Sequence, residues 1–297
     1  MVGLKELRNR IGSVKSTQKI TRAMQMVAAS KLRRAQEAVE ASRPYSTRME
    51  KVLASVGASM MDKVGASKLL VGTGKDLINL LVVATSERGL CGAFNSSIIR
   101  KVRHDIQNLE NEGKEVKIFC VGKKGRDMLK REYGHKIINT VDLSSEKNIS
   151  FSTSQPITNL IIELFEKNEF DNCTIYFNKF HSVMHQEASK IQLIPVQLPQ
   201  VSDKEGNSNH YSNIFYDFEP EEDEILSELL PRNMRVQIFQ SLLENAASEQ
   251  GARMTAMDNA TRNAGEMIEN LTLSYNRTRQ AVITSELIEI ISGAEAV

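Results

Sequence analysis

The chain has 297 residues, of which 25% are charged and 5% aromatic, and it contains no tryptophan. That length allows one or two domains with a sizeable core, and the scarcity of aromatic residues suits helices better than a large sheet core. No stretch of about 20 apolar residues occurs, so the sequence does not predict a membrane-spanning helix. The three cysteines lack CxxC or metal-type spacing, which indicates reduced thiols in a cytosolic compartment.

The net charge of +1 conceals a strong asymmetry between the two ends of the chain. Residues 1–51 carry 12 Lys/Arg and 4 Asp/Glu, a net of +8. Residues 217–297 carry 6 Arg and 15 Asp/Glu, a net of −9. Two helical segments of opposite sign are natural partners, so we expect the ends to pair with each other.

Residues 3 to about 57 predict a first long helix. Its heptad begins with Leu4, Leu7, Ile11 and Val14, and an apolar stripe is expected to continue through Ile20, Met24, Val27 and Leu32. Pro44 should kink or break this helix. The glycines from Gly57 to Gly74 then indicate its end and a linker.

The middle of the chain alternates between strand and helix patterns. Leu77–Ala84 is a continuous apolar run typical of a buried strand. The other predicted strands are 116–121, 136–141, 172–180 and 187–196, and the predicted helices are 94–111, 126–133 and 156–168. This alternation predicts a Rossmann-like α/β domain, largely parallel, over about residues 75–200.

Residues 201–219 predict a polar loop that ends in a foot. The acidic run Glu221–Glu224 suits the first turn of a helix, because acidic side chains complement the helix dipole. At Pro231 that helix should either kink or give way to a second helix. We therefore expect the C-terminal helical segment to cover residues 220–297.

The stretch Pro231–Ser292 consists mostly of strong helix formers and would be roughly 90 Å long as one helix. A compact 300-residue globule is only about 50 Å across, so this helix should protrude and lie against a partner. Its heptad seam is Met254, Met257, Thr261, Ala264, Ile268, Leu271, Tyr275, Thr278 and Val282. A long core helix is the alternative that periodicity alone leaves open.

The fold expected from these elements is a mixed α+β one. A long antiparallel coiled coil, formed by the N-terminal helix (1–60) and the C-terminal helix, should flank the inserted α/β domain.

Few residue patterns point to catalysis or ligand binding. Gly72–Asp76 lacks the first glycine of a phosphate loop and precedes a strand instead of following one. Ser86–Asn95 follows a strand and leads into a helix, so its amides could cradle an anion, but a tight turn that presents Arg88 to a partner fits better. Cys91 has no nearby histidine to act as a base.

Two further patterns have simple explanations. His181 and His185 have a metal-like interval for a helix, but their region looks like strand or loop and no third ligand is evident, which favours exposed histidines. The basic first helix could grip nucleic acid, yet it has no aromatic residue before Tyr45 and an acidic helix in the same chain can neutralise it. We therefore expect no metal and no cofactor.

Three stretches resemble one known family. They are Ile20–Arg34 (ITRAMQMVAASKLRR), Glu87–Gly92 (ERGLCG) and Ile283–Ala294 (ITSELIEIISGA). These closely resemble the gamma subunit of F-type ATP synthases, and the C-terminal arrangement I-T-x-E-x-x-E-x-x-x-G-A is very specific to it. Arg253–Met257 and Leu271–Asn276 agree as well, so the resemblance covers nearly the whole chain.

The resemblance implies a non-catalytic central rotor shaft. It implies partners in the alpha and beta subunits of F1, the epsilon subunit and the c-ring of Fo, with membrane contact only through Fo. The expected location is peripheral, on the cytoplasmic side of a bacterial inner membrane, and a mature mitochondrial protein is the alternative. No cysteine pair of the chloroplast redox-switch kind is present.

The resemblance also assigns binding residues. Arg279, Gln280 and Thr284 match positions that touch a beta-subunit loop. Basic side chains expected to face the beta subunits are Lys19, Arg22, Arg33, Arg34 and Arg88. Tyr216, Phe218 and Glu219 match the foot on the c-ring, although the family often has Tyr where this chain has Phe218.

Two other classes of function compete with this reading. One is a basic coiled-coil arm that presents an α/β domain to RNA, which salt-dependent RNA retention would favour. The other is an α/β enzyme with a coiled-coil dimerisation element, which turnover by residues 70–205 alone would favour.

Overall fold

The computed structural model describes residues 3–60, 67–146, 148–197 and 222–295. The chain forms two compact units, which are considered separately. Unit 1 combines residues 1–30 with residues 253–297, and unit 2 is residues 31–252. The longest helices, α1 (Leu4–Met60) and α6 (Glu222–Glu295), contribute residues to both units. The division into four segments made from the sequence stays a prediction.

Unit 1 is a pair of antiparallel helices. Gln25 donates to the Asp258 carboxylate over 2.9 Å, and the hydroxyls of Thr21 and Thr261 lie 2.7 Å apart. Later residues of α1 therefore contact earlier residues of α6, as in an antiparallel pair. The predicted seam of α6 is confirmed from Met254 to Thr278: each of its residues is buried or half-buried, whereas Val282 is exposed.

The expected stripe on α1 is partly wrong. Ile20 and Val27 are 59% and 56% exposed. The buried face instead keeps the 3,4 spacing with polar and small side chains, through Gln18, Thr21, Gln25 and Ala28. The buried face follows the heptad spacing that begins with the first four apolar residues, even where polar or small residues occupy the later positions.

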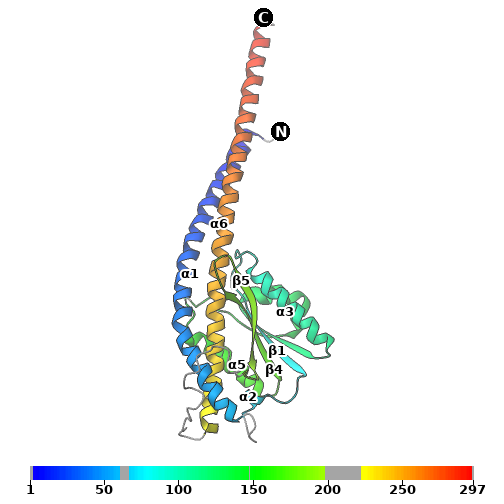
Figure 1. Ribbon diagram of the computed structural model, residues 1–297. Coiled ribbons are helices and arrows are strands. Elements are labelled where there is room, and N and C mark those ends of the chain that lie inside the picture. Colours follow the sequence, from blue (N-terminus) through cyan, green and yellow to red (C-terminus); the bar gives the residue numbers. More distant parts are fainter. Residues whose placement is uncertain (1–2, 61–66, 147, 198–221, 296–297) are drawn as a thin grey trace, which may run out of the picture. The chain divides into compact units, whose positions relative to one another are not determined.

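The two helices of unit 1 end at different points. Helix α1 begins at Leu4, and the contacts between Thr21 and Thr261 place that first turn opposite about residue 278. From Arg279 to Ala294 every residue of α6 is exposed. Figure 1 shows the end marked C continuing past the end marked N. The last four turns of α6 therefore have no helix of this unit beside them, as far as the described residues show.

Unit 2 is built on a five-stranded sheet in the order β3-β2-β1-β4-β5. The strands are β1 (Ile78–Ala84), β2 (Glu115–Val121), β3 (Ile137–Val141), β4 (Asn172–Phe180) and β5 (Gln186–Ile194). All pairs are parallel except β4 with β5. The largely parallel α/β domain is confirmed.

Helices cover both faces of the sheet (Figure 1). One face packs against α3 (Phe94–Asn111) and α4 (Lys123–Tyr133). The other packs against α5 (Phe151–Glu166) and against Met234, Ile238 and Leu242 of α6. Alternate residues of β1 serve the two cores, which explains why its sequence is continuously apolar.

The prolines do not break either long helix. Pro44 lies inside α1 and Pro231 inside α6, so a break at Pro44 and a second helix starting at Pro231 are both wrong, whereas the alternative of a kink at each proline stays a prediction. An interior proline costs about 3 kcal/mol. A buried cluster that includes Met49 and Leu53 of α1 with Leu230 of α6 stabilises these stretches.

Smaller elements complete the unit. The sequence did not indicate the short helix α2 (Lys68–Val71) or the 3-10 turn Gly134–Lys136. Among the described helices, none combines the length and apolar character needed to cross a bilayer.

Candidate partner-binding surfaces

The loop after β1 is a rigid turn that holds Arg88 at the surface. Ser86 N–H donates to the Asn95 side-chain oxygen over 3.1 Å, and the Ser86 hydroxyl donates to the Arg88 carbonyl over 2.7 Å. The Asn95 amide returns a hydrogen bond to Ser86 Oγ over 2.8 Å. Arg88 itself is exposed. The turn is therefore fixed from within, which suits a surface for a partner better than a mobile ligand loop.

A carboxylate of the chain lies at the amino end of helix α4. Glu87 accepts hydrogen bonds from the N–H of Lys123, at the start of α4, over 3.2 Å, and from the N–H of Leu143 over 2.7 Å. The position just before Lys123 requires a glycine. Gly122 has φ +102°, and a Cβ there would lie 2.4 Å from the Thr85 carbonyl oxygen. Helix N-termini bind anions, and here the anion is internal.

Helix α6 covers the point where ligands bind in open α/β sheets. That point lies at the carboxyl ends of β1 and β4, where the strand order reverses. Asn178, on β4, donates its N–H to the Asn245 side-chain oxygen over 3.1 Å, and its carbonyl accepts from Ser248 over 2.9 Å. Ala252 packs beside Cys91 and Phe94 in the same region. A helix thus fills the crevice that a nucleotide would need.

A buried carboxylate lies one residue before Asn245 on α6. Glu244 is 6% exposed and accepts the N–H of Phe180 over 3.0 Å. The Arg43 guanidinium of α1 lies 4.0 Å from its other oxygen. These contacts hold α1, β4 and α6 together. Sequence patterns alone do not indicate these contacts, because polar residues in a helix are usually solvated.

The phosphate-loop-like stretch has a structural role. Thr73 donates to the Asp171 carboxylate over 2.6 Å, and the N–H groups of Leu77 and Ile78 donate to its other oxygen. Burial alone would raise the pKa of Asp171, but these hydrogen bonds outweigh it and hold the pKa below its usual value. The stretch tethers the amino ends of β1 and β4.

The predicted beta-subunit contacts of unit 1 lie in two places. Arg279, Gln280 and Thr284 are exposed on the last turns of α6, and the Thr284 hydroxyl donates to the Gln280 carbonyl over 2.9 Å. Arg22 is exposed on α1 opposite about residue 260. Roughly 30 Å along the axis separates these places. They present two separate surfaces.

Of the remaining predicted residues, Lys19 lies in unit 1, and the others lie in unit 2 or outside the described residues. Arg33 and Arg34 are exposed on α1, and Arg33 pairs with Glu37 over 3.1 Å. Lys19, in unit 1, is also exposed. Tyr216, Phe218 and Glu219 fall outside the described residues.

Comparisons with known proteins agree with this arrangement. A family model described as ATP synthase matches residues 3–297. The ATP synthase gamma chains of Jannaschia sp. and Rhodospirillum rubrum are each 55% identical to this chain, over 296 and 300 residues, and the matches cover 100% of each sequence. That of Rhizobium etli is 56% identical over 296 residues, again with full coverage of both sequences.

Solved structures are similar as well. The central stalk and c-ring structure of the Tetrahymena thermophila mitochondrial ATP synthase contains a chain that is 25% identical, with a TM-score of 0.59, covering 81% of this chain and 99% of that one. A chain of the Euglena gracilis mitochondrial ATP synthase in rotational state 3 is 21% identical, with a TM-score of 0.67, covering 99% of this chain and 94% of that one. The full-length matches to the curated gamma chains, at 55–56% identity, settle the family: the chain belongs to the ATP synthase gamma chains.

Proposed function

We infer that the chain is the central-stalk rotor subunit of an F1Fo ATP synthase. In this role it couples ion-driven rotation of the c-ring to ATP synthesis or hydrolysis at the beta subunits. It is a non-catalytic subunit, because gamma chains form the stalk and the nucleotide chemistry belongs to the beta subunits. The filled crevice at the carboxyl ends of β1 and β4 is consistent with that division of labour.

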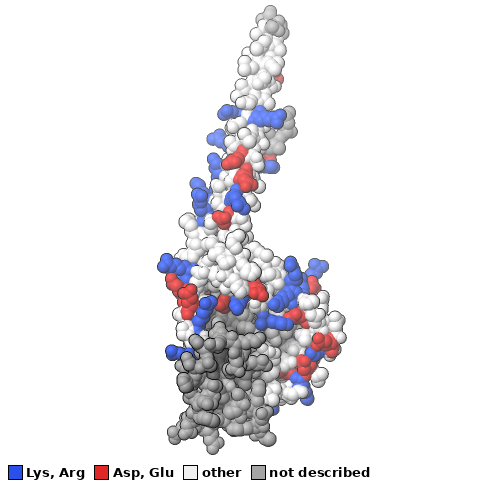
Figure 2. Space-filling model, in the orientation of Figure 1, with Lys and Arg blue, Asp and Glu red and all other residues white. Residues whose placement is uncertain are grey.

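The observation that carries this proposal is the free end of α6. Beyond Thr278 the helix exposes large apolar side chains, namely Val282, Ile283, Leu287, Ile288, Ile290 and Ile291, which are 37% to 69% exposed. No Lys or Arg follows Arg279, and Figure 2 shows this end almost without charge. An apolar helix end of this kind indicates a surrounding protein surface. A ring of alpha and beta subunits would supply that surface.

The other proposed partners are the epsilon subunit and the c-ring. The Tetrahymena structure named above joins a central stalk to a c-ring, which supports contact with a c-ring, and the family resemblance assigns the foot to Tyr216, Phe218 and Glu219. The chain is a peripheral subunit that meets the membrane only through Fo. The bacterial relatives favour the cytoplasmic side of a bacterial plasma membrane.

Coupling requires that the shaft bind the three beta subunits differently. A ligand shifts a conformational equilibrium only by its difference in affinity for the two states. The surface of unit 1 has that asymmetry, because Arg279 and Gln280 lie on one helix only and Arg22 lies on the other. Each orientation of the shaft would then offer these polar groups to a different beta subunit.

Replacing Arg279 with Ala tests this role. We expect weaker coupling in assembled complexes, measured as reduced ATP-driven proton pumping for each ATP hydrolysed, with an unchanged helical circular dichroism spectrum. Arg277→Ala is the matched control, because it removes another exposed arginine two residues earlier on α6. Unchanged synthesis and pumping in the Arg279 variant would refute the assignment of this residue.

Copurification tests the function itself. A tagged chain expressed with alpha and beta subunits should be recovered with both, in a complex that hydrolyses ATP. Deleting residues 282–297 should weaken that recovery, because it removes the apolar end. Retention of RNA in place of these subunits, reversed by salt, would support the nucleic-acid alternative and reject the rotor.

A further inference from the structure

Two histidines close the hairpin between β4 and β5. The N–H of His181 donates to the carbonyl of His185 over 3.3 Å, and the N–H of His185 donates to the carbonyl of Ser182 over 3.2 Å. The strand register pairs Phe180 with Gln186 and Lys179 with Glu187, so His181 stands opposite His185. Opposite residues share a face of the ribbon, and so do residues two apart. His181, His185 and Glu187 therefore lie on one face.

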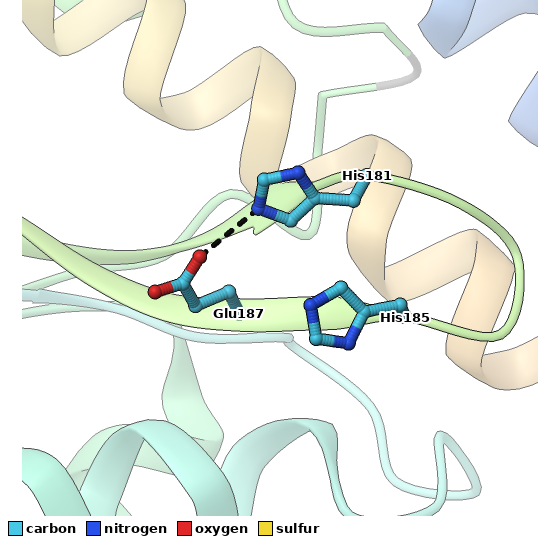
Figure 3. A group of neighbouring side chains, drawn as sticks. All are labelled: His181, His185 and Glu187. Carbon is cyan, nitrogen blue, oxygen red and sulfur yellow. Dashed lines mark hydrogen bonds and ion pairs between the residues drawn. The ribbon is translucent and has the colours of Figure 1, made fainter.

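The three side chains converge on that face, as Figure 3 shows. His181 Nε2 lies 3.0 Å from a Glu187 carboxylate oxygen, and the two imidazole rings stack with centroids 5.2 Å apart. One ligand-type atom from each of the three residues lies within 4.8 Å of the other two. All three side chains are exposed, so a solvated ion can reach them.

We propose that His181, His185 and Glu187 form a binding site for a late first-row divalent metal, with Zn²⁺ the ion of choice and water completing the shell. Two imidazoles and one carboxylate are ligands that Zn²⁺ accepts, whereas Mg²⁺ and Ca²⁺ prefer oxygen ligands alone. Ligand atoms around tetrahedral Zn²⁺ are about 3.3 Å apart. The contact between His181 and Glu187, at 3.0 Å, is close to that spacing, and a rotation of the exposed His185 ring would bring in the third ligand.

The opposite face of the hairpin keeps its backbone in place. Phe180 packs against α6 so closely that a Cβ on Gly251 would lie 3.1 Å from its ring. Val183, in the turn, packs in the cluster that contains Leu243 and Ala247. Gln186 donates to the Val183 carbonyl over 2.7 Å. A site on a fixed backbone needs only side-chain movement to bind its ion.

One neighbouring charge opposes the ion. Lys179 is the register partner of Glu187 and lies on the same face as the three ligands. Its ammonium group competes with a cation for the Glu187 carboxylate. Lys179→Met should therefore tighten metal binding, in contrast to every substitution of a ligand.

Titration of the metal-free full-length chain tests the site. We expect one Zn²⁺ per chain by isothermal titration calorimetry and a tetrahedral-type visible spectrum with Co²⁺. His181→Ala and His185→Ala should each weaken binding at least tenfold, and Glu187→Gln should weaken it less. His104→Ala is the matched control, because His104 is an exposed histidine of the same unit that lies on α3. It should leave the affinity unchanged.

Thermal unfolding supplies a second readout. Zn²⁺ should raise the melting temperature of the wild-type chain but not of the double variant His181→Ala/His185→Ala, because only the folded hairpin assembles the ligands. Circular dichroism of the variant without metal verifies that it folds. The proposal is overturned if the double variant binds Zn²⁺ as tightly as wild type, or if the wild-type chain shows no saturable binding.

Discussion

The helix pair of unit 1 and the sheet of unit 2 are stabilised in different ways. The sheet buries continuous apolar runs on both faces, with Leu80, Phe119 and Ile161 fully buried. The helix pair meets along a single seam that includes Thr21, Gln25 and Thr261 and is half-exposed at most positions. The comparison teaches that the α/β core supplies most of the stability and that the seam chiefly sets register.

The largest expected effect comes from making the same substitution, Leu to Ala, in the core of unit 2 and in the seam of unit 1. Leu80→Ala should lower the free energy of unfolding by about 2–5 kcal/mol, because it leaves a cavity in a dense core. Leu271→Ala, at a half-buried seam position, should cost about 1 kcal/mol. Amide hydrogen exchange, followed separately for β1 and for residues 254–278, measures both. Equal losses at the two sites would show that the seam is as important for stability as the core.

A second test removes a buried polar contact in unit 2. Asn245→Ala leaves the buried N–H of Asn178 without its acceptor and should cost about 1–3 kcal/mol. The matched change on an exposed part of α6, Asn259→Ala, should stay within about 0.5 kcal/mol. Urea unfolding of both variants checks the difference. A neutral Asn245 variant would mean that its hydrogen bond to Asn178 contributes little to anchoring α6 at the end of β4.

Acid should weaken unit 2 through Asp171. Its pKa is lowered in the folded chain, so its contribution is complete above the unfolded value of about 3.9 and is lost as the pH falls through the folded value. Asp171→Asn should be less stable than wild type at pH 7, and the gap should close on acidification below about pH 4. Unfolding curves across that range measure the gap. A gap independent of pH would rule out the linkage.

The smallest expected effect is an absence of thiol reactivity. All three cysteines lie in the described part of unit 2 and are buried, and burial raises the pKa of Cys120 to about 12. Only the thiolate reacts with alkylating reagents. The folded chain should therefore resist alkylation at pH 8, and the unfolded chain should react at all three positions. Mass spectrometry counts the modified thiols, and rapid labelling of Cys120 in the folded chain would reveal a looser core.

Local patterns predicted the elements of unit 2 well. The bounds expected for α3 and β4 agree with the structure to the residue, because glycine-containing stretches adjoin α3 and polar stretches adjoin β4. The seam of α6 followed from its spacing alone. The buried face of α1 was harder to predict. Ile20 and Val27 are apolar but exposed, whereas the buried positions beside them are Thr21 and Ala28.

Contacts that depend on distant parts of the chain could not be predicted from local patterns. Glu187 lies close to both histidines in the sequence, only two residues after His185, but it meets His181 because β4 pairs with β5, which a helix-type interval of four residues did not indicate. The hydrogen bond between Asn178 and Asn245 joins residues 67 positions apart, and no pattern near Asn178 predicts it. The predicted partner residues still depend on the family resemblance and await the substitutions described above.

The insertion of α6 side chains into the core of unit 2 has a practical consequence for protein engineering. A fragment that ends near residue 197 would lack Met234, Ile238 and Leu242, and one apolar wall of its sheet would face water. Such a fragment should aggregate when expressed alone, and coexpression with a peptide spanning residues 222–252 should rescue its solubility. Activity assays on the excised sheet would therefore report on a misfolded species.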